Sequence, residues 1–162
     1  TRKKEKLMEI EFMFTNPSAA EAYKGELTRG SEGSAGIDLR YVGNTTIYLA
    51  PNAPPVRLHT GVRVNMTSAK NMCALALPRS GLGHDEGFFL GNTVGLFDND
   101  YQGEVLLSCA CRGKTSIIIP YGHRIAQLVF VPFLLPRLRM VDGEFSNSTE
   151  RGSGGFGSTG RT

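Results

Sequence analysis

An aspartate in the middle of the chain has the neighbours that a water-activating base needs. In GNTVGLFDNDYQGE (residues 91–104), the apolar pair LF comes directly before Asp98, and Tyr101 places a flat ring nearby. A carboxylate held against a partly apolar wall, with a hydrogen-bonding neighbour, can act as a base toward water. The alternative is structural, because Asn99 and Asp100 are typical of a tight hairpin turn.

A second stretch combines the groups that bind phosphate. The apolar run MCALAL stops at Pro78, and Arg79, Ser80 and Gly81 follow it in LPRSGLG (residues 77–83). An arginine, a hydroxyl and backbone N–H groups left open by glycine can together contact phosphate oxygens. Taken alone, the same residues also describe a surface turn whose arginine is merely solvated.

Two further polar side chains interrupt apolar segments. Asp38 stands at the start of an apolar strand in SAGIDLR (residues 34–40), where an unpaired carboxylate would be costly. We expect it to have a hydrogen-bond or metal-water partner, or to pair with a backbone turn. Gln127 interrupts the apolar run in RIAQLV (residues 124–129), so it either faces outward or is directed into a site.

The glycine-rich stretch RGSGGFGSTG (residues 151–160) carries one arginine and one aromatic ring. Glycines let backbone N–H groups approach phosphate oxygens, Arg151 can add a bidentate contact, and Phe156 can stack on a base. The spacing also fits GxGxxG, but a Rossmann fingerprint needs a strand before it and a helix after it. A Walker loop would need lysine after Gly157, where Ser158 stands. The composition alone is typical of a disordered terminus.

The segments that must position these residues are rich in β-strand signals. Clusters of Gly, Pro and Asn recur about every ten residues, and strand-like runs lie between them: MEIEFMF, VRLHTGVRVNM, MCALAL, EVLLSCACR, TSIIIP and RIAQLVFVPF. One short helix is plausible, at residues 18–23. This pattern predicts an all-β fold of jelly-roll or distorted-barrel type. We expect one domain, with an N-terminal extension and first strand (1–33), a β core (34–141) and a glycine-rich arm (142–162).

Composition excludes several classes of protein. The chain has 162 residues, a net charge of +3 and 40% hydrophobic residues, as in an ordinary globular domain. No apolar run approaches the ~20 residues of a membrane span, and the small net charge argues against direct nucleic-acid binding. The three cysteines form no CxxC and no even disulfide framework, which favours a reducing, cytoplasmic setting. The three histidines are scattered, unlike a zinc site.

Together and in this order, the five segments closely resemble the five motifs of the trimeric dUTPases (dUTP diphosphatases). The match runs from about Ser34 to Gly160 and looks most like bacterial and phage members. The resemblance implies a homotrimer of jelly-roll-like subunits, with active sites at subunit interfaces and a C-terminal arm that closes over a neighbour's site. The implied reaction converts dUTP and water into dUMP and pyrophosphate with Mg²⁺, which keeps uracil out of DNA and supplies dUMP for thymidylate synthesis.

The resemblance also implies a role for each matching residue. Asp98 would activate a water for in-line attack on the α-phosphorus, and Tyr101 would pack under the deoxyribose and exclude a 2′-hydroxyl. Asp38 would lie near the water shell of the metal and contact it indirectly. The remaining implied substrate contacts are the hairpin that reads uracil (Asn92, Leu96, Phe97, with Leu106 nearby), the phosphate turn (Arg79, Ser80, Gly81), Gln127, and the arm (Arg151, Phe156, Gly157, Ser158).

Some positions depart from the family pattern. Phe97 stands where a small aliphatic residue is usual, His123 where an acidic residue often precedes RIAQ, and HDEG after the second motif is unusually acidic.

Two alternative functions stay open. A dCTP deaminase shares the fold, but that family carries a catalytic glutamate where this chain has Ser108. The second alternative is a regulatory protein that binds dUTP in order to engage an unknown protein partner.

Overall fold

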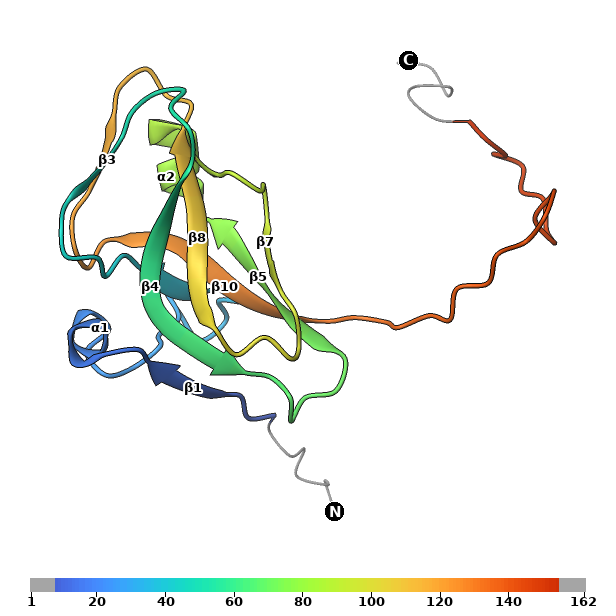
Figure 1. The fold of residues 1–162 in the computed structure, drawn as a ribbon, viewed down its shortest axis with the longest axis horizontal. Coiled ribbons are helices and arrows are strands. Elements are labelled where there is room, and N and C mark those ends of the chain that lie inside the picture. The colour runs from blue at the N-terminus through green and yellow to red at the C-terminus, as the bar shows by residue number, and fades with distance from the viewer. Residues whose placement is uncertain (1–7, 155–162) are drawn as a thin grey trace.

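The computed structural model describes residues 8–154, which form a β-sandwich followed by an extended segment (Figure 1). Two four-stranded sheets have the strand orders β1-β4-β8-β6 and β2-β10-β5-β7, and β3 pairs with β9 in a small third sheet. The predicted all-β class is therefore confirmed. The elements in chain order are β1 (Glu11–Phe14), α1 (Pro17–Ala22), β2 (Ile37–Arg40), β3 (Ile47–Leu49), β4 (Val56–Asn65), β5 (Met72–Pro78), α2 (Ser80–Glu86), β6 (Phe88–Leu90), β7 (Gly95–Phe97), β8 (Glu104–Cys111), β9 (Ile117–Ile119) and β10 (Arg124–Pro132).

Alternating side chains of the long strands build the core between the sheets. On β4 and just beyond it, Val62, Val64 and Met66 are buried, as the alternation in VRLHTGVRVNM predicts. On the neighbouring strand β8, Val105 and Leu107 face the same interior. Burying side chains of this size stabilises the fold by roughly 1.5–3 kcal/mol each.

Strand β10 lies between β2 and β5, so it organises the second sheet. Its residue Gln127 is opposite Asp38 of β2 on one side and Leu77 of β5 on the other. The segments that contain Asp38, Gln127 and the end of β5 are therefore held side by side by backbone pairing.

Residues 8–154 form two short helices where the sequence suggested one. Helix α1 matches the expected position, and the Asn16 side chain caps it by accepting a hydrogen bond from the Ala19 N–H (2.8 Å). Helix α2 was not expected, so the prediction of a single helix is wrong. Its SGLG start contains two glycines, which are poor helix formers. Gly87 ends α2 in the left-handed conformation (φ 74°), which glycine adopts without steric cost.

Residues 98–103 do not form the predicted tight hairpin. Strand β7 pairs with β5, whereas β8 pairs with β4 and β6, so these residues cross from one sheet to the other. We call them the crossover segment. Residues 99 and 100 do form a turn, closed by a hydrogen bond from the Tyr101 N–H to the Asp98 carbonyl (3.1 Å). The turn itself was predicted correctly, but the prediction that its flanking strands pair with each other was wrong.

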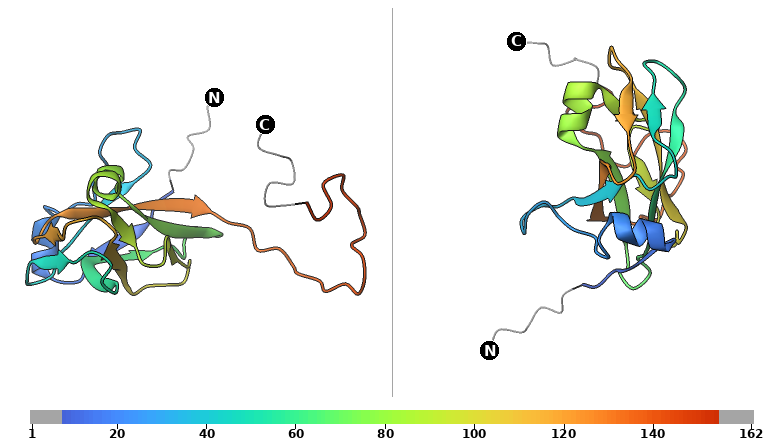
Figure 2. Two further views of the ribbon diagram at one scale, coloured as in Figure 1. Left: turned by 90° about the horizontal axis from the view of Figure 1, so that it is seen from above. Right: turned by 90° about the vertical axis from the view of Figure 1, so that its left-hand side faces the viewer.

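The segment formed by residues 133–154 runs away from the sandwich (Figures 1 and 2). Five of its apolar side chains are between 76% and 89% exposed: Leu134, Leu135, Leu138, Met140 and Phe145. Within residues 8–154, neither helix has the length and apolar character needed to cross a bilayer.

Candidate functional site

A polar pocket of about 240 Å³ forms where β2, β10 and the end of β5 meet. Residues far apart in the sequence converge there, because β10 pairs with both neighbouring strands. We call it the Asp38 pocket. Its lining combines the predicted residues Asp38, Arg79, Ser80, Gly81 and Gln127 with Gly30, Ser34, Gly36 and Arg124, which sequence reasoning did not select.

The carboxylate of Asp38 lies between two guanidinium groups. Its Oδ2 is 3.1 Å from Nη1 of Arg124, and its Oδ1 is 3.4 Å from Nε of Arg79. The partners expected for this aspartate are therefore arginines, not a backbone turn. Two cations against one anion leave the pocket positively charged, and its lining includes no other carboxylate.

Arg79 and the start of α2 present further groups that can bind an anion. Arg79 occupies the N-cap position with an extended backbone, and Ser80 and Gly81 begin the helix. The first N–H groups of a helix have no acceptor inside the helix. Arg79, Ser80 and Gly81 all line the Asp38 pocket, so the start of α2 borders it.

A buried tyrosine anchors the strand that carries Asp38. The Tyr23 hydroxyl accepts a hydrogen bond from the Arg40 N–H (2.7 Å) at the end of β2 and donates one to the Arg40 carbonyl (3.3 Å). Burial raises the pKa of Tyr23 above its ordinary value. The hydroxyl therefore stays protonated and holds β2 in place throughout the physiological pH range.

The predicted base lies in a different part of the chain. Asp98 is the first residue after β7, and its side chain is exposed. Phe97 turns into the core (9% exposed), while Leu96 faces outward (61% exposed). The partly apolar wall expected around Asp98 is therefore not formed within one chain.

Tyr101 has a fixed ring close to Asp98. Its ring centroid is 5.9 Å from that of Phe97, and its hydroxyl donates a hydrogen bond to the Glu104 carbonyl (2.8 Å). A methyl group added at Gly103 would come 2.5 Å from the Tyr101 hydroxyl, so glycine makes room for this ring. Asn92 is exposed beyond β6, and Leu106 is half-buried on β8.

The two groups of residues are separated by the length of β5. Phe97, just before Asp98, pairs with Ala74 near the start of β5, whereas Pro78, just before Arg79, ends the strand. At about 3.3 Å per residue, this places Asp98 about 15–20 Å from the Asp38 pocket. One chain alone does not bring Asp98 and this pocket together.

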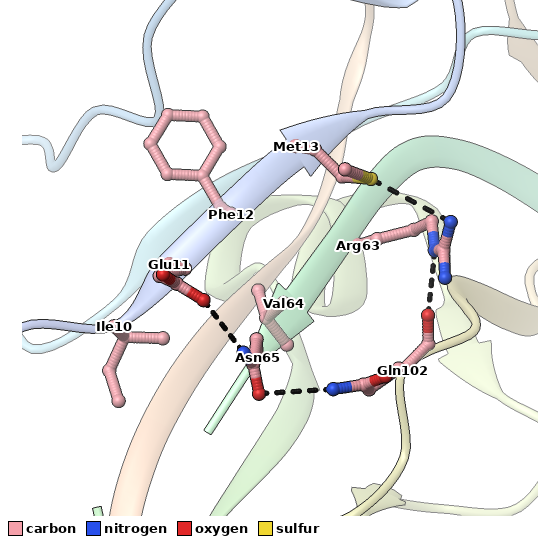
Figure 3. A pocket seen from close by; sticks show the side chains of 8 residues that line it. All are labelled: Ile10, Glu11, Phe12, Met13, Arg63, Val64, Asn65 and Gln102. Atoms are coloured by element: carbon pink, nitrogen blue, oxygen red, sulfur yellow. Dashed lines mark hydrogen bonds between the residues drawn. The ribbon is translucent and has the colours of Figure 1, made fainter. Parts of the chain in front are cut away.

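A larger hollow of about 660 Å³ lies between β1 and β4 (Figure 3). None of the predicted site residues lines it. Its polar side chains bind each other: Asn65 donates to Glu11 (2.7 Å), Gln102 donates to Asn65 (3.2 Å), and Arg63 donates to the Gln102 carbonyl (2.6 Å). These bonds tie the crossover segment to β4 and β1.

Only part of the predicted arm can be located. Arg151 is exposed and donates a hydrogen bond from Nε to the Gly154 carbonyl (2.9 Å). Phe156, Gly157 and Ser158 lie outside the described residues. Among residues 8–154, no three side chains of His, Cys, Asp or Glu are grouped so that they could hold a metal ion.

Comparison with known proteins gives a consistent result. The family model "dUTPase" matches residues 23–160. Two relatives are both named deoxyuridine 5′-triphosphate nucleotidohydrolase. The one from Methylobacillus flagellatus is 51% identical over 129 residues, which is 80% of this chain and 83% of the relative. The one from Klebsiella pneumoniae is 47% identical over 134 residues, or 83% of this chain and 86% of the relative.

A solved structure has the same fold. The dUTPase of Staphylococcus bacteriophage 80alpha, in complex with dUPNHPP, matches with a TM-score of 0.80. The match covers 94% of this chain and 98% of that chain, at 24% sequence identity.

Proposed function

The chain belongs to the dUTPase family, and from this premise we propose that Asp98 activates the water that attacks dUTP. The enzyme hydrolyses dUTP to dUMP and pyrophosphate. The observation that supports binding of the triphosphate is the Asp38 pocket, where Arg79, Arg124, Gln127 and the start of α2 converge. A triphosphate has the negative charge and the many acceptor oxygens that such a pocket can bind.

The residues of the pocket fit a magnesium ion that the substrate itself carries. Mg²⁺ keeps several of its waters and needs few protein ligands when phosphates bind it. Asp38 is the only carboxylate in the lining, and both of its oxygens already contact arginines. Asp38 would therefore contact the ion through water. When bound, Mg²⁺ supplies positive charge that neutralises the phosphates.

Asp98 acts by position more than by strength. Its exposed carboxylate is a weak base, so holding a water in line with the α-phosphorus supplies much of the acceleration. The proton of that water passes to the carboxylate as the new bond to phosphorus forms and pyrophosphate leaves. Tyr101, fixed by its bond to Glu104, packs under the deoxyribose, and Asn92 with Leu96 contacts the uracil.

The separation along β5 supports an active site shared between subunits. A complete site needs Asp98 of one chain beside the Asp38 pocket of another, which a homotrimer provides. The exposed apolar residues beyond β10 are also typical of a segment that packs against a partner chain. In this arrangement the arm, with Arg151 and Phe156, closes over a neighbour's site. All three cysteines are buried and unpaired, which fits the reducing cytoplasm.

Pyrophosphate release tests the proposal. The purified protein with Mg²⁺ is expected to release pyrophosphate from dUTP and not from dTTP, dCTP or UTP. Asp98→Asn should lower kcat by roughly 10²–10⁴ while dUMP still binds. Glu21→Gln, at an exposed carboxylate of α1, is the control. Normal turnover by Asp98→Asn would remove that residue from its role. Ammonia release from dCTP would favour a deaminase, and dUTP binding without turnover would favour a regulatory protein.

A further inference from the structure

The side chain of Asn99 binds three backbone carbonyl groups at once. Its Nδ2 lies 2.9 Å from the carbonyl oxygens of Met66, Ala69 and Met72. Met66 and Ala69 belong to the connection between β4 and β5, and Met72 is the first residue of β5; we call residues 66–72 together the 66–72 loop. A primary amide has two hydrogens, so at least one of them is shared between two acceptors.

This arrangement fixes the loop and the crossover segment to each other. Met66 and Ala69 are buried, and hydrogen bonds are stronger where water is excluded. Met72 begins β5, so the third bond also ties Asn99 to the sheet that β7 joins. Asn99 is half-buried, in contrast to the exposed residues on either side of it.

The backbone of Asp98 is held from both sides. Before it, the β5–β7 ladder ends with the pairing of Phe97 and Ala74. After it, Asn99 is bound to the 66–72 loop, and the Tyr101 N–H closes the turn on the Asp98 carbonyl. Among residues 8–154, no hydrogen bond or ion pair reaches the Asp98 carboxylate itself, so within the described chain its position depends on the backbone that carries it.

We infer that Asn99 is a positioning residue for Asp98, in addition to stabilising the loop. The inference rests on the proposed role of Asp98 in the reaction. Displacing a reacting group by about 1 Å can cost about 10²-fold in rate. Loss of the Asn99 amide frees the segment that carries Asp98, while the Asp38 pocket proposed to bind the phosphates keeps all of its own contacts.

Kinetics of Asn99→Ala separate positioning from stability. We expect kcat to fall at least tenfold at 25 °C, while KM and the affinity for a non-hydrolysable dUTP analogue stay within about twofold. Asn99→Asp keeps the shape but turns acceptor oxygens toward the carbonyls, so it should lose at least as much. Asn99→Ser keeps one donor and is the milder variant if the others fold poorly. Gln102→Ala is the matched control, because Gln102 lies on the same crossover segment but its amide binds half-buried Asn65 of β4, and its loss should leave kcat unchanged.

The outcomes distinguish this inference from the proposed function. If the wild type turns over dUTP and Asp98→Asn does not, an unchanged kcat in the folded Asn99 variants overturns the inference alone. A lower melting temperature with a normal kcat would also overturn the inference, because Asn99 would then only stabilise the fold. If the wild type does not hydrolyse dUTP, the proposed function fails and the inference fails with it.

Discussion

Gly36 lies directly against the side chain of Gln127. A methyl group added at residue 36 would come 2.3 Å from Oε1 and 3.1 Å from Cβ of Gln127. Gln127 is also opposite Asp38 across the β2–β10 ladder, and its Nε2 donates a hydrogen bond to the Pro78 carbonyl (3.4 Å). The absence of a side chain at residue 36 is therefore what allows Gln127 to occupy the pocket.

Gly36→Ala should weaken dUTP binding by moving Gln127. We expect KM for dUTP to rise roughly fivefold, the equivalent of one hydrogen bond of about 1 kcal/mol, with little change in kcat. Gly33→Ala is the control, because a methyl group there meets nothing within 4 Å. Steady-state kinetics of the two variants give the comparison, and equal KM values would show that Gln127 does not contact the substrate.

Asp38→Asn should alter the dependence of activity on magnesium. The substitution keeps the shape but removes the charge between Arg79 and Arg124, and with it the proposed attraction to the metal's waters. We expect the Mg²⁺ concentration for half-maximal activity to rise several-fold. The partly exposed ion pairs should cost at most about 1 kcal/mol of stability. An unchanged magnesium titration, measured beside the control Glu21→Gln, would exclude Asp38 from the metal's surroundings.

Mixed trimers test whether subunits share sites. Asp98→Asn and Arg79→Ala chains should each be inactive alone, because each lacks a different part of the site. When the two are coexpressed in equal amounts, about a quarter of the sites combine an intact Asp98 with an intact pocket. Separately tagged chains allow the hybrids to be purified and assayed. Hybrids that form but stay inactive would show that each chain carries a whole site.

Deletion of residues 150–162 should reduce kcat/KM for dUTP by at least tenfold, because the closing arm and its Arg151 are lost. The melting temperature should change little, since residues 150–153 are exposed and residue 154 lies outside the core. Arg151→Ala should show part of the loss with the rest of the arm present. A large fall in melting temperature after the deletion would instead mean that the arm stabilises the fold.

Local patterns in the sequence predicted those features that depend on neighbouring residues. The alternation around Val62 and Val64 identified β4, and Pro78 marked the end of β5. Helix α2 was missed, because its glycines oppose a helix that tertiary contacts then impose. One such contact is the close packing of Gly87 on Gly113, where a methyl group at Gly87 would come 2.5 Å from the Gly113 nitrogen.

Features that depend on pairing between distant strands could not be predicted from the sequence. The supposed hairpin around Asn99 crosses between sheets, which only the partners of β7 and β8 reveal. Arg124 was overlooked because a charged residue at the start of a strand is common and does not by itself indicate a site. Its contact with Asp38 follows from the register of β10 on β2. The sequence identified Asp38 and Gln127 as candidate site residues, but it did not predict that they lie opposite each other on β2 and β10.

The length of β5 has a consequence for cells that make both normal and defective chains. Because Asp98 and Arg79 lie near opposite ends of this strand, a chain in the proposed shared assembly would contribute them to two different sites. A chain that has lost either residue spoils one site, and a chain that has lost both spoils two. An allele carrying the double change would therefore act dominantly, and would silence more activity than its own gene dosage accounts for.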